Sequence, residues 1–374
     1  MAERSKERIR YAVVGLGHIA QAAMLPAFEN AENSELVALV SHDDEKLKKL
    51  GKKYGIEKKN RVHYDQFEEL LDRGQVDAVY IALPNHLHAE YTHRAAKKGV
   101  HVLCEKPLGV TAQECREMIE VCEKEDVLLM TAYRLHFEEA NLEVMNLAQR
   151  GEIGELRFFQ STFSQNVSDE GDIRLLPLEK GGGTLYDMGI YCINAARYLF
   201  GDEPIDATAV STRRNADPRF SKSDEMTAAT LRFPKERLAS FVSSFGGANI
   251  STFRLVGTEG EIRLEWAYKY AMESRMTVRV GEEEWEKTFE ARDQFGPQLI
   301  YFSQCIIEGI DPEPDGYEGL GDVEIIEALY ESSRHNKPVT LTVTPSKKRP
   351  VVEQIIIRPP VEKPEEIKAS SPSK

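Results

Sequence analysis

The sequence predicts a two-domain protein, with an N-terminal α/β domain on a doubly wound parallel sheet and a C-terminal α+β domain on a mostly antiparallel sheet. Over the first 136 residues, short apolar segments alternate with helical ones, which is the order that builds a doubly wound sheet. From about residue 156, apolar and polar residues alternate between short polar turns, as in an antiparallel sheet with one covered face. The 374 residues are also too many for a single ordinary core.

Composition and charge narrow the class of protein. Hydrophobic residues make up 41% of the chain and charged residues 29%, which is typical of a soluble, folded protein. The net charge of −14 argues against a nucleic-acid or membrane surface, and no apolar run is long enough to span a bilayer. The charged start of the chain has no apolar signal segment, so we expect a cytoplasmic protein. The five cysteines never form a Cys-x-x-Cys pair and the histidines lack ligand spacing, so no metal site is expected.

The first element is an apolar strand, residues 10–16, that breaks on glycine. It runs into Gly-Leu-Gly-His-Ile-Ala over residues 15–20, a G-x-G-x-x-A fingerprint that opens a helix. The two glycines allow a tight turn and a close approach to a pyrophosphate, whose charge the helix N-terminus favours. A turn that binds nothing is the alternative, but the position between strand and helix is typical of a Rossmann dinucleotide site. The residues expected to contact the cofactor are Gly15, Gly17, His18 and Ile19.

The end of the second strand, 36–40, indicates which dinucleotide to expect. An NAD site usually has Asp or Glu there, which binds the ribose 2′-hydroxyl. This chain has Ser41 and His42, with Lys46 one turn into the next helix. A hydroxyl with a nearby cation suits a 2′-phosphate, so NADP(H) is favoured, although two aspartates lie close by. Ser41 could also simply cap the helix.

The next strand, 76–83, is apolar throughout, as a central parallel strand should be. It ends at Leu83, and the following helix, 86–98, has Asn85 as a good cap. Asn85 and His88 could also line the cofactor crevice. We therefore expect Leu83, Asn85 and His88 near the cofactor.

A further strand ends at Cys104 and is followed by Glu105 and Lys106. Ligands of parallel sheets bind beyond the carboxyl ends of the strands. A lysine placed there can be desolvated and can serve proton chemistry. The plain alternative is a solvated lysine in a polar loop. A helix over 112–124 and a strand over 127–132 complete the predicted sheet.

In the second half, β-branched and aromatic residues alternate with polar ones. The expected strands are 158–165, 207–212, 226–233, 238–244, 253–256, 261–266 and 276–280, with helices 297–308 and 323–334 near the sheet edge. The expected division is an NADP-binding domain over residues 1–136, a substrate and oligomerisation domain over 137–345 and a tail over 346–374. The tail is rich in Pro, Lys and Glu, which predicts either a mobile segment or a docking arm.

A glycine-rich stretch over 181–192 holds a second candidate cluster. Asp187 and Tyr191 are four residues apart and so share one face of a helix, near its N-terminus. Thr184 and Asp187 could instead form a capping box, and Tyr191 could be an ordinary helix tyrosine. Spacing alone leaves both interpretations open.

Three motifs together carry a family resemblance: Gly15-x-Gly17, Glu105-Lys106-Pro107 and Gly182-Gly-x-x-x-Asp187-x-Gly189. They resemble the Gfo/Idh/MocA family of NAD(P)-dependent sugar oxidoreductases. The segments around Leu83, Tyr133 and Tyr191 are most similar to its glucose–fructose oxidoreductase group. The resemblance implies a Rossmann domain followed by a half built on a large open β-sheet.

The resemblance also implies roles for individual residues. Lys106 and Tyr191 would be the catalytic pair, with Asp187 beside them. The implied substrate residues are Lys106, Arg134, His136, Asp187 and Tyr191, and Glu105, Lys106, Arg134 and Arg174 would lie near the nicotinamide. A neighbouring ammonium favours the phenolate of a tyrosine. Tyr191 would then take the hydroxyl proton of a sugar while hydride moves to NADP⁺, with Lys106 stabilising the charge in the reverse direction.

We therefore expect oxidation of an aldose at C1 to a lactone, with the hydride passed to a second sugar where the cofactor stays bound. A xylose or glucose 1-dehydrogenase that releases its cofactor, or a dihydrodiol dehydrogenase, is an alternative. A non-catalytic dinucleotide sensor that binds a protein partner is an alternative of another class, and the intact set of Lys106, Asp187 and Tyr191 argues against it. The expected partners are a small sugar and further copies of the chain in a homodimer or homotetramer, with neither nucleic acid nor membrane.

Overall fold

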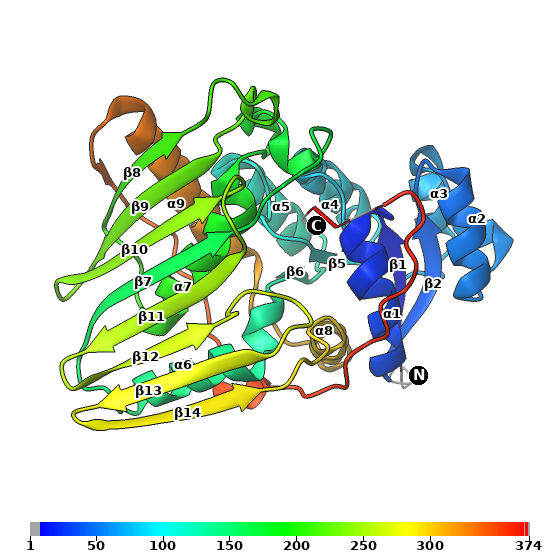
Figure 1. Ribbon diagram of the computed structural model, residues 1–374. Helices are drawn as coiled ribbons and strands as arrows, with labels where there is room; N and C mark the ends of the chain where they lie inside the picture. The colour runs from blue at the N-terminus through cyan, green and yellow to red at the C-terminus, as the bar shows by residue number, and fades with distance from the viewer. Residues whose placement is uncertain (1–7, 370, 373–374) are drawn as a thin grey trace.

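The computed structural model describes residues 8–369, 371 and 372. Residues 1–7 of the predicted NADP-binding domain and residues 370, 373 and 374 of the predicted tail lie outside the described residues. Two β-sheets dominate the described part, one of six strands and one of nine. In Figure 1 the nine-stranded sheet lies on the left and the six-stranded sheet on the right. The predicted combination of an α/β and an α+β half is confirmed.

The six-stranded sheet has the order β3-β2-β1-β4-β5-β6, and every neighbouring pair is parallel. Its strands are β1 (Ile9–Val14), β2 (Ser34–Val40), β3 (Arg61–Val62), β4 (Ala78–Ile81), β5 (His101–Cys104) and β6 (Leu129–Thr131). The helices of this part are α1 (Leu25–Ala27), α2 (Asp44–Lys53), α3 (Phe67–Asp72), α4 (His88–Ala96) and α5 (Ala112–Lys124). The strand order reverses between β1 and β4, so their carboxyl ends border the crevice where such sheets bind ligands.

The nine-stranded sheet has the order β14-β13-β12-β11-β7-β10-β9-β8-β15. Only the pair of β7 and β10 is parallel among the described strands of this sheet. Its strands are β7 (Leu156–Ser164), β8 (Asp206–Thr212), β9 (Met226–Phe233), β10 (Arg237–Ser244), β11 (Ile250–Gly257), β12 (Gly260–Glu265), β13 (Ser274–Val280), β14 (Glu283–Phe289) and β15 (Val339–Thr340). One face is covered by α6 (Glu139–Gln149), α7 (Ile190–Phe200) and α9 (Gly316–His335), while every second residue of β9 is exposed on the other (Figure 1).

Two strands of this sheet carry no sequence signal. β14 has exposed polar side chains at most of its positions, so it lacks the apolar alternation that indicates a strand. An edge strand can be polar in this way because only one of its sides pairs with a neighbour. β15 has two residues, which is too short for any periodicity.

After the second sheet the chain returns to the first. α8 (Gly296–Glu308) packs on β1 and β2. Phe295 and Leu299 share a buried core with Tyr11 of β1, and the hydroxyls of Tyr11 and Ser303 lie 2.9 Å apart. The two halves are therefore joined by this packing as well as by the chain crossing between β6 and α6.

The tail after β15 also crosses back to the first half, as the red segment of Figure 1. Arg358 Nε donates to the Asn30 carbonyl at 3.1 Å, and its Nη2 pairs with Glu32 at 2.8 Å. Residues 366–368 then contact the turn after β1 and the start of α2. The tail is thus docked along the first half over much of its length.

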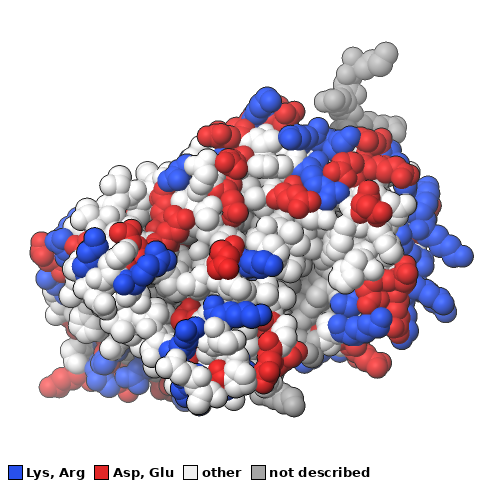
Figure 2. Space-filling view, turned by 90° about the horizontal axis from the view of Figure 1, so that it is seen from above, with Lys and Arg blue, Asp and Glu red and all other residues white. Residues whose placement is uncertain are grey.

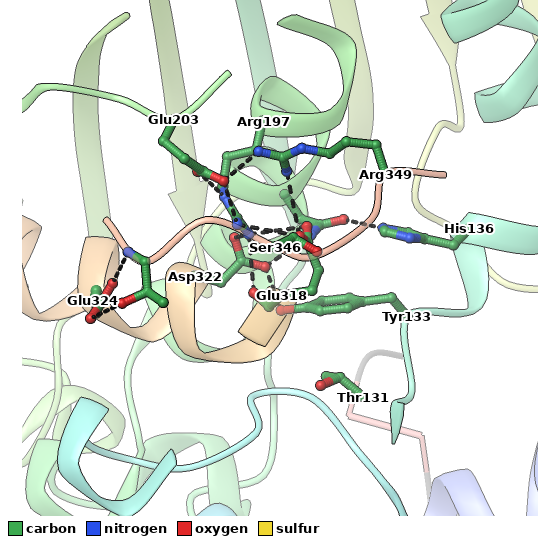
Figure 3. A network of polar contacts seen from close by, with 12 residues as sticks. Thr131, Tyr133, His136, Arg197, Glu203, Glu318, Asp322, Glu324, Ser346 and Arg349 are labelled. Carbon is green, nitrogen blue, oxygen red and sulfur yellow. Dashed lines mark hydrogen bonds and ion pairs between the residues drawn. The ribbon is translucent and has the colours of Figure 1, made fainter. Parts of the chain in front are cut away.

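A buried polar network joins α7 and α9 (Figure 3). Arg197 Nη1 contacts Glu318 at 3.0 Å and Asp322 at 2.8 Å, and all three side chains are fully buried. Tyr133, which follows β6, donates to Asp322. His136 belongs to the same network, so it ties the end of the first sheet to the helices of the second half.

Positive and negative side chains are interspersed on the face seen in Figure 2, without a continuous basic patch there. In the described part of the chain, no helix is both long and apolar enough to cross a membrane. Across residues 8–369, 371 and 372, no group of three or more His, Cys, Asp or Glu side chains is placed to hold a metal ion. The five cysteines are buried free thiols.

Candidate active site

A cavity of about 700 Å³ opens between the carboxyl ends of β1, β4 and β5 and the residues that follow β7 and β12. This volume is in the range of small-molecule sites. Most of the predicted site residues line it, namely Gly17, His18, Ile19, Leu83, Asn85, His88, Glu105, Lys106, Arg134, Arg174, Asp187 and Tyr191. The predicted residues outside its lining are Gly15, Ser41, His42, Lys46 and His136.

Lys106 and Asp187 meet in the cavity although they are 81 residues apart in the chain. Lys106 Nζ donates to the Asp187 main-chain carbonyl at 2.7 Å and to its Oδ1 at 3.1 Å. Arg174 Nε donates to the other carboxylate oxygen, Oδ2, at 2.8 Å. The alternative for Asp187, a capping box with Thr184, is not formed, because the Thr184 hydroxyl donates to Asp224.

The carboxylate of Asp187 and the ammonium of Lys106 stabilise each other in their charged forms. Burial alone would raise the pKa of Asp187, but Arg174 and Lys106 outweigh it and hold that pKa far below its usual range. Burial would lower the pKa of Lys106, but the negative charges around it, Asp187 first, leave that pKa raised. Both groups are therefore ionised at neutral pH. A lysine has three N–H donors, and two of them serve Asp187, which leaves one for a ligand.

Tyr191 stands one helical turn beyond Asp187, at the start of α7. The centroid of its ring lies 4.7 Å from Lys106 Nζ and 5.3 Å from Arg134 Cζ. Phe163 packs edge-on against the same ring at 5.5 Å. Among the described residues the Tyr191 hydroxyl has no hydrogen-bond partner, so it is free to contact a ligand in the cavity.

Two buried neighbours hold the loop that carries Lys106. Glu105 accepts a hydrogen bond from the Tyr80 hydroxyl and another from the Lys106 amide at 3.2 Å. Burial raises the pKa of Glu105. The ring nitrogens of His88 lie 2.8 Å and 2.9 Å from carbonyls of the loops after β5 and β4. Glu105 and His88 therefore fix the two loops that border the crevice, in addition to lining it.

The glycines after β1 leave room for a phosphate group. Gly15 has a φ of 95°, and a Cβ there would lie 2.4 Å from the Ala82 carbonyl oxygen. A Cβ at Gly17 would meet nothing within 4 Å, and Gly17 lines the cavity. Bare backbone just before the helical turn that begins at Ala20 fits the pyrophosphate of a dinucleotide.

The residues predicted to choose between NAD and NADP lie where β2 ends and α2 begins. Ser41 is buried, and its hydroxyl accepts from the Asp43 amide at 3.2 Å. Asp43, rather than Ser41, caps α2 through the amides of Glu45 at 2.9 Å and Lys46 at 3.1 Å. His42 is exposed and Lys46 is half-buried. The capping alternative is thus wrong for Ser41, because Asp43 is the cap of α2.

His136 lies apart from the cavity, contrary to a position against the substrate. Its ring is fully buried, 2.8 Å from Glu313 Oε1 and 2.8 Å from Asn194 Oδ1. Both ring nitrogens are thus engaged, and His136 is part of the polar network of Figure 3. The structure gives His136 a place in the packing between the two halves.

Lys269 lines the cavity but belongs to no motif. Its Nζ donates to Gln165 Oε1 at 3.2 Å, and burial lowers the pKa of Lys269. Gln165 follows β7 and Lys269 follows β12, so only the pairing of the nine-stranded sheet brings them together. No local pattern could have marked either residue.

A crevice fitted for a dinucleotide, beside a cluster of Lys106, Asp187 and Tyr191, defines a nucleotide-dependent oxidoreductase. The model of the oxidoreductase family with an NAD-binding Rossmann fold matches residues 9–133, and that of the GFO/IDH/MocA C-terminal domain matches residues 141–263. The chain therefore belongs to the Gfo/Idh/MocA oxidoreductase family.

Individual relatives match most of the chain. The D-xylose 1-dehydrogenase [NADP(+)] of Haloarcula marismortui is 32% identical over 340 residues, which are 89% of this chain and 93% of the relative. The solved structure of aldose-aldose oxidoreductase from Caulobacter crescentus, complexed with glycerol, has 37% identity and a TM-score of 0.86, with 89% of this chain and 100% of that chain covered. A 3-ketoreductase from Actinomadura kijaniata in complex with NADP and TDP-benzene has 27% identity and a TM-score of 0.79 over 87% of this chain and 98% of that chain.

Proposed function

We propose that this protein is an NADP-dependent sugar oxidoreductase that oxidises an aldose at C1 to the lactone. The observation that carries the proposal is the cluster of Lys106, Asp187 and Tyr191 at the cavity, where a lysine donor and a tyrosine hydroxyl remain free. The activities of two relatives, a xylose dehydrogenase using NADP⁺ and an aldose-aldose oxidoreductase, support the same substrate class.

The proton chemistry is assigned to Tyr191. NADP⁺, when bound, supplies the hydride acceptor. As the phenolate favoured by the Lys106 ammonium, Tyr191 takes the proton of the sugar hydroxyl while the hydride leaves the sugar carbon for NADP⁺, and as the phenol it returns that proton to the developing alkoxide in the reverse direction. The free N–H of Lys106 stabilises negative charge on that oxygen in either direction. Asp187 keeps Lys106 protonated, because its carboxylate raises the pKa of the ammonium.

Polar groups around the cluster would bind the other sugar hydroxyls. Arg134, Arg174 and Lys269 line the cavity beside Asp187. A site built to hydrogen-bond a hydroxyl rejects analogues that lack it, because its buried polar groups are then unpaired. We therefore expect deoxy sugars to be poor substrates at the positions these residues contact.

NADP(H) would be held by Gly17, His18 and Ile19 at the pyrophosphate, with Ser41, His42 and Lys46 at the 2′-phosphate. The open backbone at Gly17 and the absence of an acidic residue at the end of β2 support this arrangement. A titration should show tighter binding of NADP⁺ than of NAD⁺. Lys46→Glu should weaken NADP⁺ far more than NAD⁺, since only the former loses a charge partner.

Transfer of the hydride to a second sugar is the finer part of the proposal. The test measures steady-state rates with two sugars and no added NADP⁺, after nicotinamide absorbance has been sought in denatured protein. Parallel double-reciprocal lines would support a retained cofactor, whereas an absolute need for added NADP⁺ would leave a dehydrogenase that releases it. A protein that binds NADP⁺ but oxidises no aldose would overturn the activity and favour the sensor alternative.

The open face of the nine-stranded sheet is the proposed contact between copies of the chain. Phe158 of β7 and Leu238 of β10 are 42% and 47% exposed on paired strands, and Val210 of β8, two strands beyond β10, is 64% exposed. Such apolar exposure marks interaction surfaces when it is contiguous. Light scattering on the purified protein should give a dimer or tetramer, and Val210→Glu should weaken it. A monomer at micromolar concentration would exclude this assembly.

A further inference from the structure

Three consecutive residues of the tail contact the rim of the nucleotide-binding crevice. Glu366 Oε2 lies 2.7 Å from His18 Nδ1. The Ile367 amide donates to Gln21 Oε1 at 2.8 Å, and Gln21 Nε2 donates back to the Ile367 carbonyl at 3.0 Å. His18 lines the cavity, so this segment is fixed along the rim where the fingerprint helix begins.

Lys368 extends the same contact to the adjoining strand end. Its Nζ lies 3.1 Å from Asp43 Oδ2 and 3.1 Å from Glu45 Oε2. Its backbone has a φ of 47°, which is uncommon for a residue with a side chain. Gln21 fixes the residue before it and two carboxylates hold its ammonium, so the direction of this side chain is set from both ends.

The carboxylates that Lys368 contacts stand at the edge predicted for the 2′-phosphate. Asp43 is the N-cap of α2 and accepts from the Lys46 amide, and Glu45 directly precedes Lys46 in the first turn. A phosphate at Lys46 would be repelled by free carboxylates so near, because like charges at a few ångströms disfavour each other. Burial lowers the pKa of Lys46, Asp43 and Glu366 raise it, and the Lys368 ammonium lowers it. Lys368 is therefore close enough to act on the same ion, while Glu366 is paired with His18.

We infer that Lys368 completes the NADP site by neutralising Asp43, so that a 2′-phosphate can bind beside Lys46. The inference rests on the proposed NADP dependence and adds a specificity-determining residue to it. Lys368 supplies the second positive charge that makes the edge of β2 and α2 attractive to a dianion. NAD(H), with a 2′-hydroxyl in that place, gains nothing from it.

The tail forms part of the crevice wall and leaves the crevice open, since Val361, Lys363, Ser371 and Pro372 line the cavity. With residues 366–368 in place, a cavity of about 700 Å³ remains open beside Gly17 and Lys106. The solved Caulobacter crescentus relative is covered in full by 89% of this chain, so about a tenth of this chain has no counterpart there. Lys368 thus adds its charge from the tail to an edge formed by residues of the first half.

The test is a titration of the purified full chain with NADP⁺ and with NAD⁺. Lys368→Ala should weaken NADP⁺ by about fivefold or more, the size of one exposed charge pair, and leave NAD⁺ within twofold. Lys368→Arg should keep the parent preference. Lys348→Ala removes an equal charge from the tail, where Nζ donates to the Asp311 carbonyl at 2.8 Å, and should change neither affinity.

A second variant separates neutralisation from a simple loss of tail docking. In the Lys368→Ala background, Asp43→Asn removes the exposed carboxylate while an asparagine still caps α2. It should recover most of the lost NADP⁺ affinity. The difference in NADP⁺ affinity between the parent and Lys368→Ala should shrink at high salt. A parent protein that binds neither dinucleotide would overturn the proposed function. Tight NADP⁺ binding with no effect of Lys368→Ala, equal losses for both dinucleotides, or no recovery with Asp43→Asn would overturn this inference alone.

Discussion

The helix α7 contributes to two clusters of buried charge at its two ends. Arg197, near its C-terminal end, lies in the network of Figure 3. Tyr191, at its start, stands beside Lys106 and Asp187 in the cavity. Both clusters join segments far apart in the chain, both pair cations with carboxylates, and both shift pKa values. Burial and charge therefore do not tell them apart.

The difference lies in how completely each cluster is satisfied. Arg197 uses Nε and Nη2 on Glu203, and Nη1 on Glu318 and Asp322. Asp322 also accepts from Tyr133. Within the described part of the chain, the donors of Arg197 are thus all taken, and Arg197, Glu318 and Asp322 do not line the active-site cavity. At the other end of α7, one Lys106 donor and the Tyr191 hydroxyl face 700 Å³ of open space. A site is recognised by polar groups that remain unpaired beside a cavity.

Tyr191→Phe should have the largest effect and tests whether the cluster at the start of α7 is the catalytic one. We expect kcat to fall by about 10³-fold, because general acid–base catalysis is worth 10² to 10⁴, while NADP⁺ affinity and thermal stability stay close to those of the parent. Single-turnover rates and thermal melts check both. Combining it with Lys106→Ala should add little, since the two residues act as one unit. A Phe variant that keeps most of its kcat would remove Tyr191 from the mechanism.

Arg197→Met should lower the stability of the protein and leave its turnover unchanged. It leaves Glu318 and Asp322 buried without their cation, which costs about 3–5 kcal/mol of unfolding free energy. Burial raises the pKa of Asp322 to about 6. A group whose pKa is raised in the folded state loses stability as pH rises through that value, so the deficit should be smaller at pH 5 than at pH 8. Urea unfolding at both pH values measures it.

The control for Arg197→Met is activity. At a temperature well below unfolding, kcat/KM should match that of the parent protein. Reduced turnover with unchanged stability would show that the network around Arg197 contributes to the active site.

Asp187→Asn tests the cluster of Lys106, Asp187 and Tyr191 through the pH dependence of kcat/KM. The amide keeps the size of the side chain but withdraws the charge that raises the pKa of Lys106. Burial then lowers that pKa, so Lys106 should lose its proton at a lower pH than in the parent. We expect kcat/KM to fall by about 30- to 100-fold, as when one charge-assisted contact in the transition state is lost. The alkaline limb of the pH profile should move to lower pH, and an unmoved limb would contradict the pairing.

Asp315→Asn should have the smallest effect of these substitutions. It concerns the start of α9, the helix that carries Glu318 and Asp322 of the buried network. Asp315 caps α9 by accepting from the Glu318 amide at 3.0 Å, and burial raises its pKa to about 6. Asparagine caps equally well without the buried charge. The variant should be more stable at pH 8 by about 1 kcal/mol, and the gain should vanish near pH 4, where the parent carboxyl is protonated as well. Thermal melts across this range decide it.

Sequence patterns located the strands with clear alternation, such as β9, but not β14, whose edge position allows a polar sequence. Motifs pointed to Lys106 and Asp187, which the structure brings together across 81 residues. Lys269 and Lys368 could not be found in this way, because sheet pairing and tail docking place them, and neither leaves a local pattern. His136 lies close to Arg134 in sequence, yet it faces the other side of its short helical turn and is buried in the network.

The return of α8 to the first sheet has a consequence for making chimaeras of this fold. A nucleotide-binding half cut at the predicted boundary near residue 136 would leave Phe295 and Leu299 with the other half and expose the core around Tyr11. The carboxylate of Asp43 would likewise lose its partner in the tail. Recombination with a relative therefore has to exchange three pieces of chain together, namely the first sheet, α8 and the tail. With the role inferred for Lys368, such an exchange would carry cofactor preference from both ends of the chain rather than from its first third.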